Sequence, residues 1–531
     1  MPGRLGIDFG ASNTVLAVWD PARGEGVPLH ISEFGTTIAL AHGPEEAAVS
    51  VIPTLIHYAE DGRRWIGEQV RERGLEGSER TFSLIKQYLL RRSPVQRKLG
   101  DRRVSPMQAG ADFLSAVLVS AAQQFDASNE EVALTVPVEA FEHYSDWLTG
   151  TVEQAGMPRI RLLDEPSAAA LGYGAHIQPG QAYFIFDFGG GTLDVAMVLI
   201  EEPRSNNEAG RHCRVLGKSG RHLGGSSIDA WLMQDFLRRH SRNPDADEVR
   251  RVSRALLSQC RQAKETLSRE PSARVSIEFS GAPASFDYTP AHLEELLDEH
   301  DAFTQIDQTI RRTLHAAHEH GFGEDRIDLA LLIGGSSLMP CVQKAVTRIF
   351  GREKVRLHRP LDAVARGAAA FVAGAELCDH IQHDYAVRWL NPRSGEYDYR
   401  VVVQRGTVYP TREPLARMTV KATHAGQTEL GIAIFELGDS SKAKPLVELV
   451  FDPSGAARLV ELTLDEQEQR TRFWVNEQNP TFLSATLPSE AGEPRFAVEF
   501  GVDANKRLLI TARDLKTGSW VYRDHPVVKL S

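Results

Sequence analysis

Short apolar runs that end in small or acidic residues recur through the first two thirds of the chain. Residues 132–137 form a β-branched run that Pro137 ends, and residues 329–333 form an apolar run followed by Gly334 and Gly335. The segment at residues 161–164 places Glu165 at the end of a strand, before a helix of small residues. Apolar runs of about four to eight residues bounded by Gly or Pro predict buried strands.

Other segments have helical spacing. From Val249 the apolar positions recur every three or four residues as far as Leu267, which predicts an amphipathic helix. The segments after Glu165 and at residues 362–374 are rich in small residues and predict two further helices. Such helices can pack closely, which suits a hinge between two lobes, although packing within one core explains them nearly as well. Strands alternating with helices indicate an α/β fold.

The pattern changes from about Asp384 onward. Short strand-like runs separated by polar turns follow one another at residues 399–404, 418–423, 428–435, 446–451, 460–464, 496–502 and 508–512. This spacing is typical of a β-sandwich.

Length and composition add limits. With 531 residues the chain exceeds one hydrophobic core, and its 42% hydrophobic and 25% charged residues are typical of a folded, soluble protein. We expect a cytoplasmic location, because the N-terminus lacks the apolar core of a signal peptide and no apolar run reaches about 18 residues. The net charge of -11 argues against a general nucleic-acid binder. For the basic run at residues 91–103, a solvated, partly helical surface is favoured over a local binding patch.

Four cysteines lie far apart in the chain: Cys213, Cys260, Cys341 and Cys378. They have neither the spacing of a zinc site nor the density of a disulfide framework, so we expect reduced, structural cysteines.

Residues 5–18 and 184–197 share one pattern, in which an apolar strand is followed by Asp-Phe-Gly, small residues and a second apolar strand. Each predicts a β-hairpin with a small-residue turn. If the two turns face each other, their N–H groups suit a polyanion, which Asp8 and Asp187 would repel unless a cation lay between them. The pair therefore indicates a phosphate chain with a divalent metal. Two unrelated glycine-rich turns are the alternative, which the shared frame disfavours.

Segments in family order across residues 1–376 resemble the actin-like ATPase superfamily and, within it, the heat-shock protein 70 chaperones. They are GIDFGASNT, VIPTLIHY with WIGEQ, SLIKQYL, TVP, DEPSAAALGYG, FDFGGGTLDV, HLGGSSID, CRQAKETLS, LIGGSSLMP and LDAVARGAAA. The resemblance implies a two-lobed, duplicated ribonuclease-H-like ATPase domain at residues 1–376 and a linker at 377–383. It also implies a β-sandwich peptide-binding domain at 384–531, where VVQRGTVYPT and FGVDANKRLLITARDLKTG are similar to the family's sequence.

The resemblance also implies roles for single residues. The catalytic set is Lys86, which positions the attacking water, with Glu165, Asp187 and Thr192. Asp8, Asp187 and Asp194 would hold Mg²⁺, mostly through water. The residues expected to bind ATP or ADP are Asp8, Gly10, Ala11, Ser12, Asn13, Gly189, Gly190, Gly191, Thr192, Gly224, Gly225, Ser226, Lys264, Ser268, Gly334, Gly335 and Ser336. K⁺ is a further cation that the resemblance allows.

Several positions depart from the family pattern. Glu265 and Leu338 stand where the family has arginines against the adenine, which puts base selectivity in question. Arg261 replaces a glutamate that contacts the ribose, Ala11 a threonine of the first phosphate turn, and Leu361 an aspartate. Coupling between the domains is also in question, because Ser145 replaces an arginine of the family and residues 375–383 lack its leucine-rich linker sequence.

We expect an atypical chaperone that hydrolyses ATP slowly and binds extended polypeptide, with a J-domain co-chaperone and an exchange factor as possible partners, and neither nucleic acid nor membrane. Only 13 residues follow Gly518, so we expect no helical lid and fast peptide exchange. A nucleotide-switched binding or scaffold protein with little turnover is the alternative, and a sandwich without a client site remains open. A small-molecule kinase is least favoured, because it gives the sandwich no role.

Overall fold

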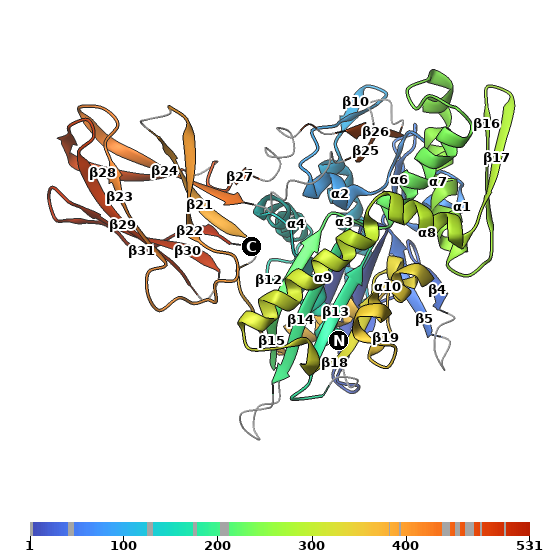
Figure 1. The fold of residues 1–531 in the computed structure, drawn as a ribbon. Coiled ribbons are helices and arrows are strands. Elements are labelled where there is room, and N and C mark those ends of the chain that lie inside the picture. The colour runs from blue at the N-terminus through green and yellow to red at the C-terminus, as the bar shows by residue number, and fades with distance from the viewer. Residues whose placement is uncertain are drawn as a thin grey trace. The chain divides into compact units, whose positions relative to one another are not determined.

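The two Asp-Phe-Gly segments form antiparallel hairpins, which confirms the prediction from their sequences. Strand β1 (Leu5–Phe9) pairs with β2 (Asn13–Asp20), and β13 (Ala182–Phe188) pairs with β14 (Leu193–Glu201). In the second hairpin Asp187 stands opposite Asp194. Each hairpin forms the middle of a larger sheet (Figure 1).

The structure is a computed structural model that describes residues 4–40, 47–124, 131–173, 178–201, 212–381, 383–391, 395–437, 447–451, 457–461, 463, 472–477, 480–503 and 506–530. The linker residue Gln382 and the ends of two expected strands, Leu446, Leu462 and Leu464, lie outside these ranges. The chain divides into two compact units. The first contains residues 1–138, 146–378 and 447–461, and the second contains residues 139–145, 379–446 and 462–531.

The first unit contains two lobes with related sheets. The sheet of lobe I has seven strands in the order β12-β11-β1-β2-β5-β4, with β3 paired to β2, and that of lobe II has six in the order β19-β18-β13-β14-β15-β20. In both, parallel strands extend one side of the hairpin. The additional strands are β3 (Glu25–Pro28), β4 (Thr36–Leu40), β5 (Ala47–Pro53), β11 (Val132–Val136), β12 (Ile160–Asp164), β15 (His212–Arg221), β18 (Ile327–Ile333), β19 (Val355–Leu357) and β20 (Glu376–Cys378).

Two small-residue helices, α5 (Glu165–Gly172) and α11 (Ala363–Val372), pack against each other and against both sheets. Their backbones nearly touch: a Cβ on Gly172 would lie 1.8 Å from the carbonyl oxygen of Ala363, and one on Gly367 would lie 1.6 Å from that of Ala168. Only glycine permits this approach, so the crossing explains why these helices contain small residues. It joins lobe I to lobe II below the cleft between them.

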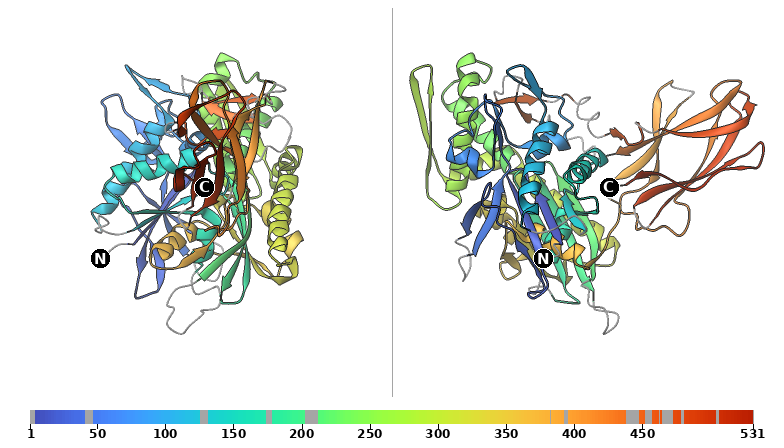
Figure 2. Two further views of the ribbon diagram at one scale, coloured as in Figure 1. Left: turned by 90° about the vertical axis from the view of Figure 1, so that its left-hand side faces the viewer. Right: turned by 180° about the vertical axis from the view of Figure 1, so that it is seen from behind.

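Further helices cover the outer faces of the sheets. Helix α9 lies along β14 and β15, as Figures 1 and 2 show. In lobe I, Phe9 of β1 contacts Phe113 of α3 and Trp147 of α4. The bounds are α3 (Pro106–Ala122), α4 (Glu142–Gln154), α9 (Ala302–Glu319) and α10 (Pro340–Phe350), with one-turn 3-10 helices at Glu324–Arg326 and Gly335–Leu338.

Each lobe also has an outer part that borders the cleft. In lobe I it consists of β6 (Ile56–Tyr58), β7 (Arg64–Ile66), α1 (Glu68–Glu72), β8 (Thr81–Phe82), α2 (Ile85–Leu90), β9 (Arg97–Leu99) and β10 (Arg102–Val104). In lobe II it consists of α6 (Gly225–Arg239), α7 (Asp247–Leu267), β16 (Ala273–Phe279), β17 (Ala282–Tyr288) and α8 (Pro290–Glu299).

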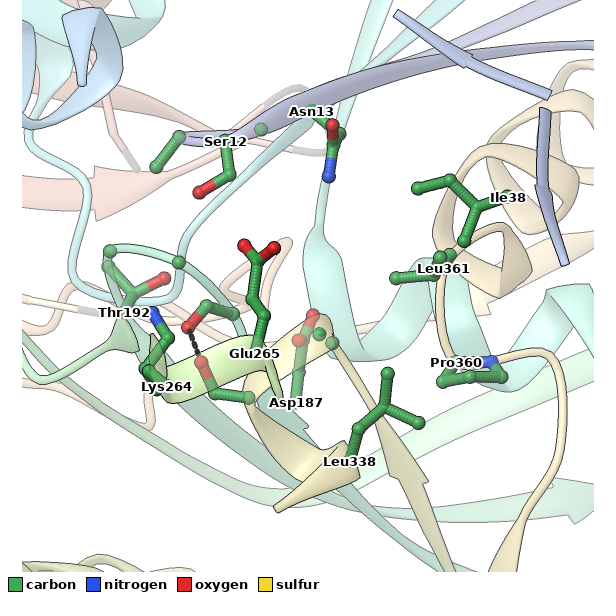
Figure 3. Close-up of a pocket in the computed structure, with 18 of the residues that line it drawn as sticks. Ser12, Asn13, Ile38, Asp187, Thr192, Lys264, Glu265, Leu338, Pro360 and Leu361 are labelled. Carbon is green, nitrogen blue, oxygen red and sulfur yellow. Dashed lines mark hydrogen bonds between the residues drawn. The ribbon is translucent and has the colours of Figure 1, made fainter. Parts of the chain in front are cut away.

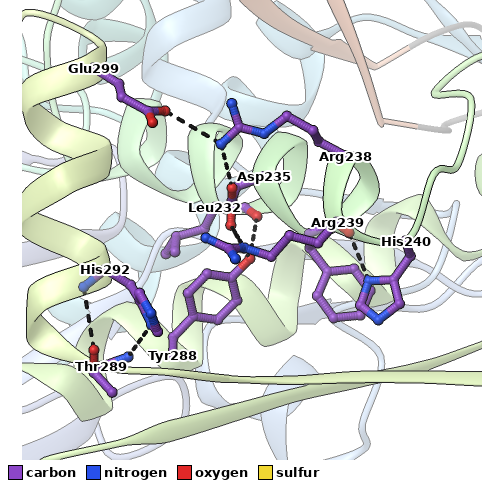
Figure 4. A network of polar contacts seen from close by, with 10 residues as sticks. Leu232, Asp235, Arg238, Arg239, His240, Tyr288, Thr289, His292 and Glu299 are labelled. Atoms are coloured by element: carbon purple, nitrogen blue, oxygen red, sulfur yellow. Dashed lines mark hydrogen bonds and ion pairs between the residues drawn. The ribbon is translucent and has the colours of Figure 1, made fainter.

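A polar network fixes the outer part of lobe II (Figure 4). Asp235 of α6 accepts hydrogen bonds from Arg238 at 2.6 Å, from Arg239 at 2.5 Å and from the hydroxyl of Tyr288 at 2.9 Å. Burial alone would raise the pKa of Asp235, but the bonds from Arg239 and Arg238 lower it overall. The network holds α6 against the end of β17, so α6 has a fixed position where it reaches the cleft.

The second unit is a β-sandwich. One sheet has the order β22-β21-β24-β27 with β28 also paired to β24, and the other has the order β23-β29-β30-β31. Apolar side chains from both sheets, including Ile434 and Phe500, form its core. The strands are β21 (Asp384–Leu390), β22 (Tyr397–Val403), β23 (Ala416–Lys421), β24 (Gln427–Leu437), β27 (Arg472–Trp474), β28 (Thr481–Ser489), β29 (Pro494–Val502), β30 (Arg507–Asp514) and β31 (Trp520–Lys529). The chain thus has the fold that the sequence predicts, a two-lobed actin-like ATPase domain followed by a β-sandwich.

Two of the strands expected in the sandwich do not belong to it. Strands β25 (Val447–Phe451) and β26 (Ala457–Glu461) pair only with each other and belong to the first unit. The sequence places the first strand correctly, but the second, expected at residues 460–464, lies at 457–461. It also assigns both to the wrong sheet, because spacing alone does not identify the partner of a strand.

The structure also bears on two smaller expectations. Cys213, Cys260 and Cys341 are buried thiols, and the side chain of Cys378 lies outside the described part of the chain. The basic run forms the β9–β10 hairpin after α2 ends at Leu90, so it is less helical than expected, and Arg97 within it is buried. Among the described residues, no helix combines the length and the apolar character needed to span a membrane.

Candidate functional site

The turns of the two hairpins face each other across the cleft. A Cβ on Gly190 would lie 2.4 Å from the hydroxyl of Ser12, and one on Gly191 would lie 3.1 Å from the Cβ of Ala11. The structure therefore brings together the two turns that the sequence assigns to a phosphate chain. Glycine keeps the backbone N–H groups of the second turn accessible at this narrow point.

Two further segments support the second turn. The N–H of Gly225 donates to Gly189 at 3.1 Å, and the N–H of Ser226 donates to Gly190 at 2.9 Å. The hydroxyl of Ser336 donates to the carbonyl of Gly189 at 2.8 Å. Three segments far apart in the sequence thus meet at residues 189–191.

Lys86 of α2 and Glu165 of α5 form a buried ion pair beside these turns. Asp164 caps α5 by accepting a hydrogen bond from the N–H of Ser167 at 2.8 Å, and it also pairs with buried Lys218 at 2.9 Å. The cap fixes the first turn of α5, which carries Glu165. Burial, with the charges of Asp194 and Asp8, raises the pKa of Glu165 to about 8, although Lys86 opposes this shift.

Three aspartates lie behind the ion pair. Burial raises the pKa of Asp187, and the charges of Glu165, Asp194 and Asp8 raise it further. Burial also raises the pKa of Asp8, against Lys86 and a 3.2 Å hydrogen bond from Thr135. Asp194 accepts a hydrogen bond from the N–H of Val138 at 2.7 Å. So many buried carboxylates repel one another, and a cation would offset this repulsion.

The described residues contain no group of three His, Cys, Asp or Glu side chains close enough to ligate one metal ion directly. Mg²⁺ is usually held through water, with a water molecule between carboxylate and metal.

A cavity of about 640 Å³ opens between the lobes. It is lined by most of the residues that the sequence assigns to nucleotide, including Asp8, Gly10, Ala11, Ser12, Asn13, Lys86, Glu165, Asp187, Gly189, Gly190, Gly191, Thr192, Lys264, Ser268, Gly334, Gly335 and Ser336. Within the described structure, the buried side-chain oxygen of Asn13 has no hydrogen-bond partner, so a ligand could satisfy it.

Four of the assigned residues are not part of the lining: Asp194, Gly224, Gly225 and Ser226. They lie behind the turns and support them. Lys264 is held at the cavity wall by Asp229 at 2.7 Å and by the carbonyl of Gly225 at 2.9 Å.

The far end of the cavity is apolar (Figure 3). Ile38, Leu338, Pro360, Leu361 and Val364 line it, and Figure 3 shows Ile38, Leu361 and Pro360 on the side away from Thr192 and Lys264. The exposed side chain of Glu265 also faces the cavity. An apolar slot of this kind suits the flat face of a base.

Three contributors were not identified from the sequence. Gln87 donates to the hydroxyl of Ser226 and so connects α2 of lobe I to α6 of lobe II. Ile38 belongs to the apolar end, and Asp229 holds Lys264. Gln87 and Asp229 stand next to recognised motif residues, but nothing in a single sequence distinguishes them from their neighbours.

The fold is that of the two-lobed actin-like ATPase class, with a cleft between the lobes. The family model described as "Hsp70 protein" matches residues 4–439, and the chain belongs to this family. The "Chaperone protein DnaK" of Thermus thermophilus, found alike in two strains of this organism, is 26% identical over 550 residues, covering 98% of this chain and 79% of the relative. Membership supports a chaperone of Hsp70 type, in a family whose members bind and hydrolyse ATP with magnesium.

Proposed function

We propose that the chain binds ATP with Mg²⁺ in the cleft, hydrolyses it slowly and uses the cycle to control binding of extended polypeptide by the sandwich. The observation that carries this proposal is the buried Lys86–Glu165 pair beside the two facing turns. Burying two ionisable side chains costs desolvation energy, and their placement next to an anion site favours a functional role over a stabilising one.

In this proposal the N–H groups of both turns hold the phosphates, and Lys86, oriented by Glu165, positions a water for attack on the terminal phosphorus. Glu165 and Asp187 accept hydrogen bonds from that water, and Thr192 orients the terminal phosphate. Mg²⁺ held through water by Asp8, Asp187 and Asp194 would neutralise phosphate charge. Positioning and charge neutralisation are what phosphoryl transfer mainly requires.

The client site is proposed for the sandwich. Of the large apolar side chains exposed in the described structure, all but Met107 and Val119 belong to the second unit. They include Trp389, Leu390, Tyr397, Phe482 and Trp520. Exposed apolar surface of this kind marks interaction sites. The same proposal includes an ATPase domain at residues 1–376 and a sandwich domain at residues 384–531. It also includes K⁺ as a second cation, co-chaperone partners and a cytoplasmic location.

Single-turnover hydrolysis of ATP by the purified chain, with Mg²⁺ and K⁺, tests the proposal. We expect slow conversion to ADP that a saturating unfolded peptide accelerates. Hydrolysis indifferent to peptide contradicts control of the sandwich by nucleotide, and failure to bind ATP contradicts the whole proposal.

A second candidate is a nucleotide-switched binding protein with little turnover. The observation that favours it is the base end of the cleft, where Leu338 and Glu265 leave no cation at those two positions to stack on adenine. This candidate would be supported if bound ATP remained unhydrolysed for many times longer than ATP takes to dissociate.

A further inference from the structure

The hairpin of β25 and β26 lies between two sandwich strands in the sequence but is not part of the sandwich. Its two strands pair with each other from Val447 opposite Glu461 to Phe451 opposite Ala457. The strands on either side in the sequence, β24 and β27, pair directly in the sandwich. Strands β25 and β26 thus lie between two sandwich strands in the sequence but belong to the first unit.

The hairpin packs on lobe II. Strand β26 contacts α7 and β25 contacts α6, and Figure 1 shows the hairpin near both helices. Ala457 is 3% exposed and joins the hydrophobic core of lobe II. Its N–H donates to the hydroxyl of Ser253 at 2.9 Å, and this hydroxyl is fully buried in α7 and donates to the carbonyl of Arg250 at 2.8 Å. A buried hydrogen bond and a buried apolar contact make this a specific docking site.

The docking site adjoins a contact across the cleft. Arg254, next to Ser253, donates from lobe II to the carbonyl oxygen of Thr81 in lobe I at 2.7 Å. Arg97 of lobe I donates to the same oxygen at 2.5 Å. Arg254 is almost fully buried, so its position depends on the packing of α7 around it.

The two helices under the hairpin also reach the proposed nucleotide site. Helix α7 carries Lys264 near its end, with Ser268 next to it, and α6 begins with Gly225 and Ser226. Release of a ligand from a cleft between two lobes requires the lobes to separate, which breaks the contacts that cross it. Anything that fixes α7 at Ser253 and Arg254 therefore opposes release.

We propose that the hairpin Val447–Glu461 is a docking segment that holds Ser253 and Arg254 in place for the contact with Thr81 and so slows nucleotide release. This inference rests on the proposed nucleotide site. It gives residues from within the C-terminal half of the sequence a direct effect on the cleft, independent of the segment that joins the two halves.

The experiment uses the full chain loaded with fluorescent mant-ADP and Mg²⁺, chased with excess unlabelled ATP in a stopped-flow instrument. Ser253→Ala removes the acceptor for Ala457 and should speed release roughly fivefold, the effect of one hydrogen bond. Ser258→Ala is the matched control in the same helix, since the described residues give the hydroxyl of Ser258 no hydrogen-bond partner, and release should stay at the wild-type rate. Replacing residues 447–461 by a Gly-Ser linker should speed release by about tenfold or more.

Arg254→Gln, alone and combined with the linker replacement, tests the route. Both single changes should speed release, and the combination should add little, because they act on one contact. Independent, multiplying effects would overturn the inference, as would wild-type release rates in Ser253→Ala and in the linker variant. Thermal unfolding shows whether each variant is folded. If the linker variant or Arg254→Gln is not folded, the release rate of Ser253→Ala alone tests the inference. Failure of the wild-type chain to bind mant-ADP would contradict the proposed function instead.

Discussion

The two ends of the cleft are built differently. At the phosphate end, Gly190, Gly224 and Gly334 have no room for a Cβ, and Lys86 and Glu165 are buried together. At the base end, Ile38, Leu338 and Leu361 form an apolar slot, and Glu265 beside it is exposed.

The difference follows from what each end must do. Phosphoryl transfer depends on groups placed to within a fraction of an ångström, so its residues are fixed by several neighbours. Apolar contacts of many shapes can hold a base, so on the proposed function the base end should tolerate residues such as Glu265 and Leu338. Changes at the phosphate end should therefore have larger effects than changes at the base end.

The largest effect is expected from Lys86→Ala. Removing the ammonium that positions the water should lower the single-turnover rate of ATP hydrolysis by at least about 100-fold. ATP affinity should stay nearly unchanged, because Lys86 acts on the water and not on the base. Lys98→Ala, at an exposed lysine of β9, is the control and should behave as wild type. A normal rate in Lys86→Ala would remove the catalytic assignment.

A steric change at the phosphate end should come next. Gly334 has φ +80°, and a Cβ there would lie 2.4 Å from the carbonyl oxygen of Phe188. Gly334→Ala should lower the free energy of unfolding by about 3 kcal/mol and weaken nucleotide binding. Gly62→Ala is the matched control, because Gly62 has φ +85° but open space around it. It should lower the free energy of unfolding by about 1 kcal/mol. Equal losses in denaturant unfolding would show that backbone conformation, and not crowding, requires the glycine.

The carboxylates of the phosphate end predict a pH effect. Folded Glu165 keeps its proton to about pH 8, whereas an unfolded chain releases it near its ordinary pKa of 4.5. Between these values the folded state holds more protons, so the contribution of Glu165 to stability falls as pH rises, by up to about 1.4 kcal/mol per pH unit.

Denaturant unfolding without nucleotide or Mg²⁺, at several pH values between about 5 and 8, measures this effect. The free energy of unfolding of Glu165→Gln, relative to that of the wild type, should increase with pH. Glu60→Gln, at an exposed carboxylate, should show no such trend. A difference that is constant with pH would contradict a raised pKa at Glu165.

The same contrast explains how far the sequence could predict the molecule. The phosphate end could be predicted from the sequence, because glycine, aspartate and hydroxyl residues repeated in one order have few other uses. Gly190 and Ser12 do face each other in the structure. Helices α5, α7 and α11 were predicted from apolar spacing and small residues. These signals are local and depend on residue type.

Predictions failed where the outcome depended on a distant partner. A strand is expected at residues 446–451 and found at 447–451, but the strand expected at 460–464 lies at 457–461, and both dock on lobe II, because their partner is fixed by packing such as that of Ala457. Gln87 contacts Ser226 only because the lobes close on each other. Ile38 joins the base end from an edge strand that has no motif.

The smallest effect is expected at the base end. Leu338→Arg places a cation where it could stack on a purine, and such contacts contribute about 0.5–1 kcal/mol at partly exposed sites. ATP affinity, measured by calorimetry with Mg²⁺, should rise roughly two- to fivefold, with little change in the rate of hydrolysis, because the phosphate end is untouched. Leu415→Arg, at an exposed leucine of the second unit, supplies the same charge away from the cleft and should leave affinity unchanged. A larger gain than this, or a change in the hydrolysis rate, would show that the two ends are coupled and that the base end does more than hold the ligand.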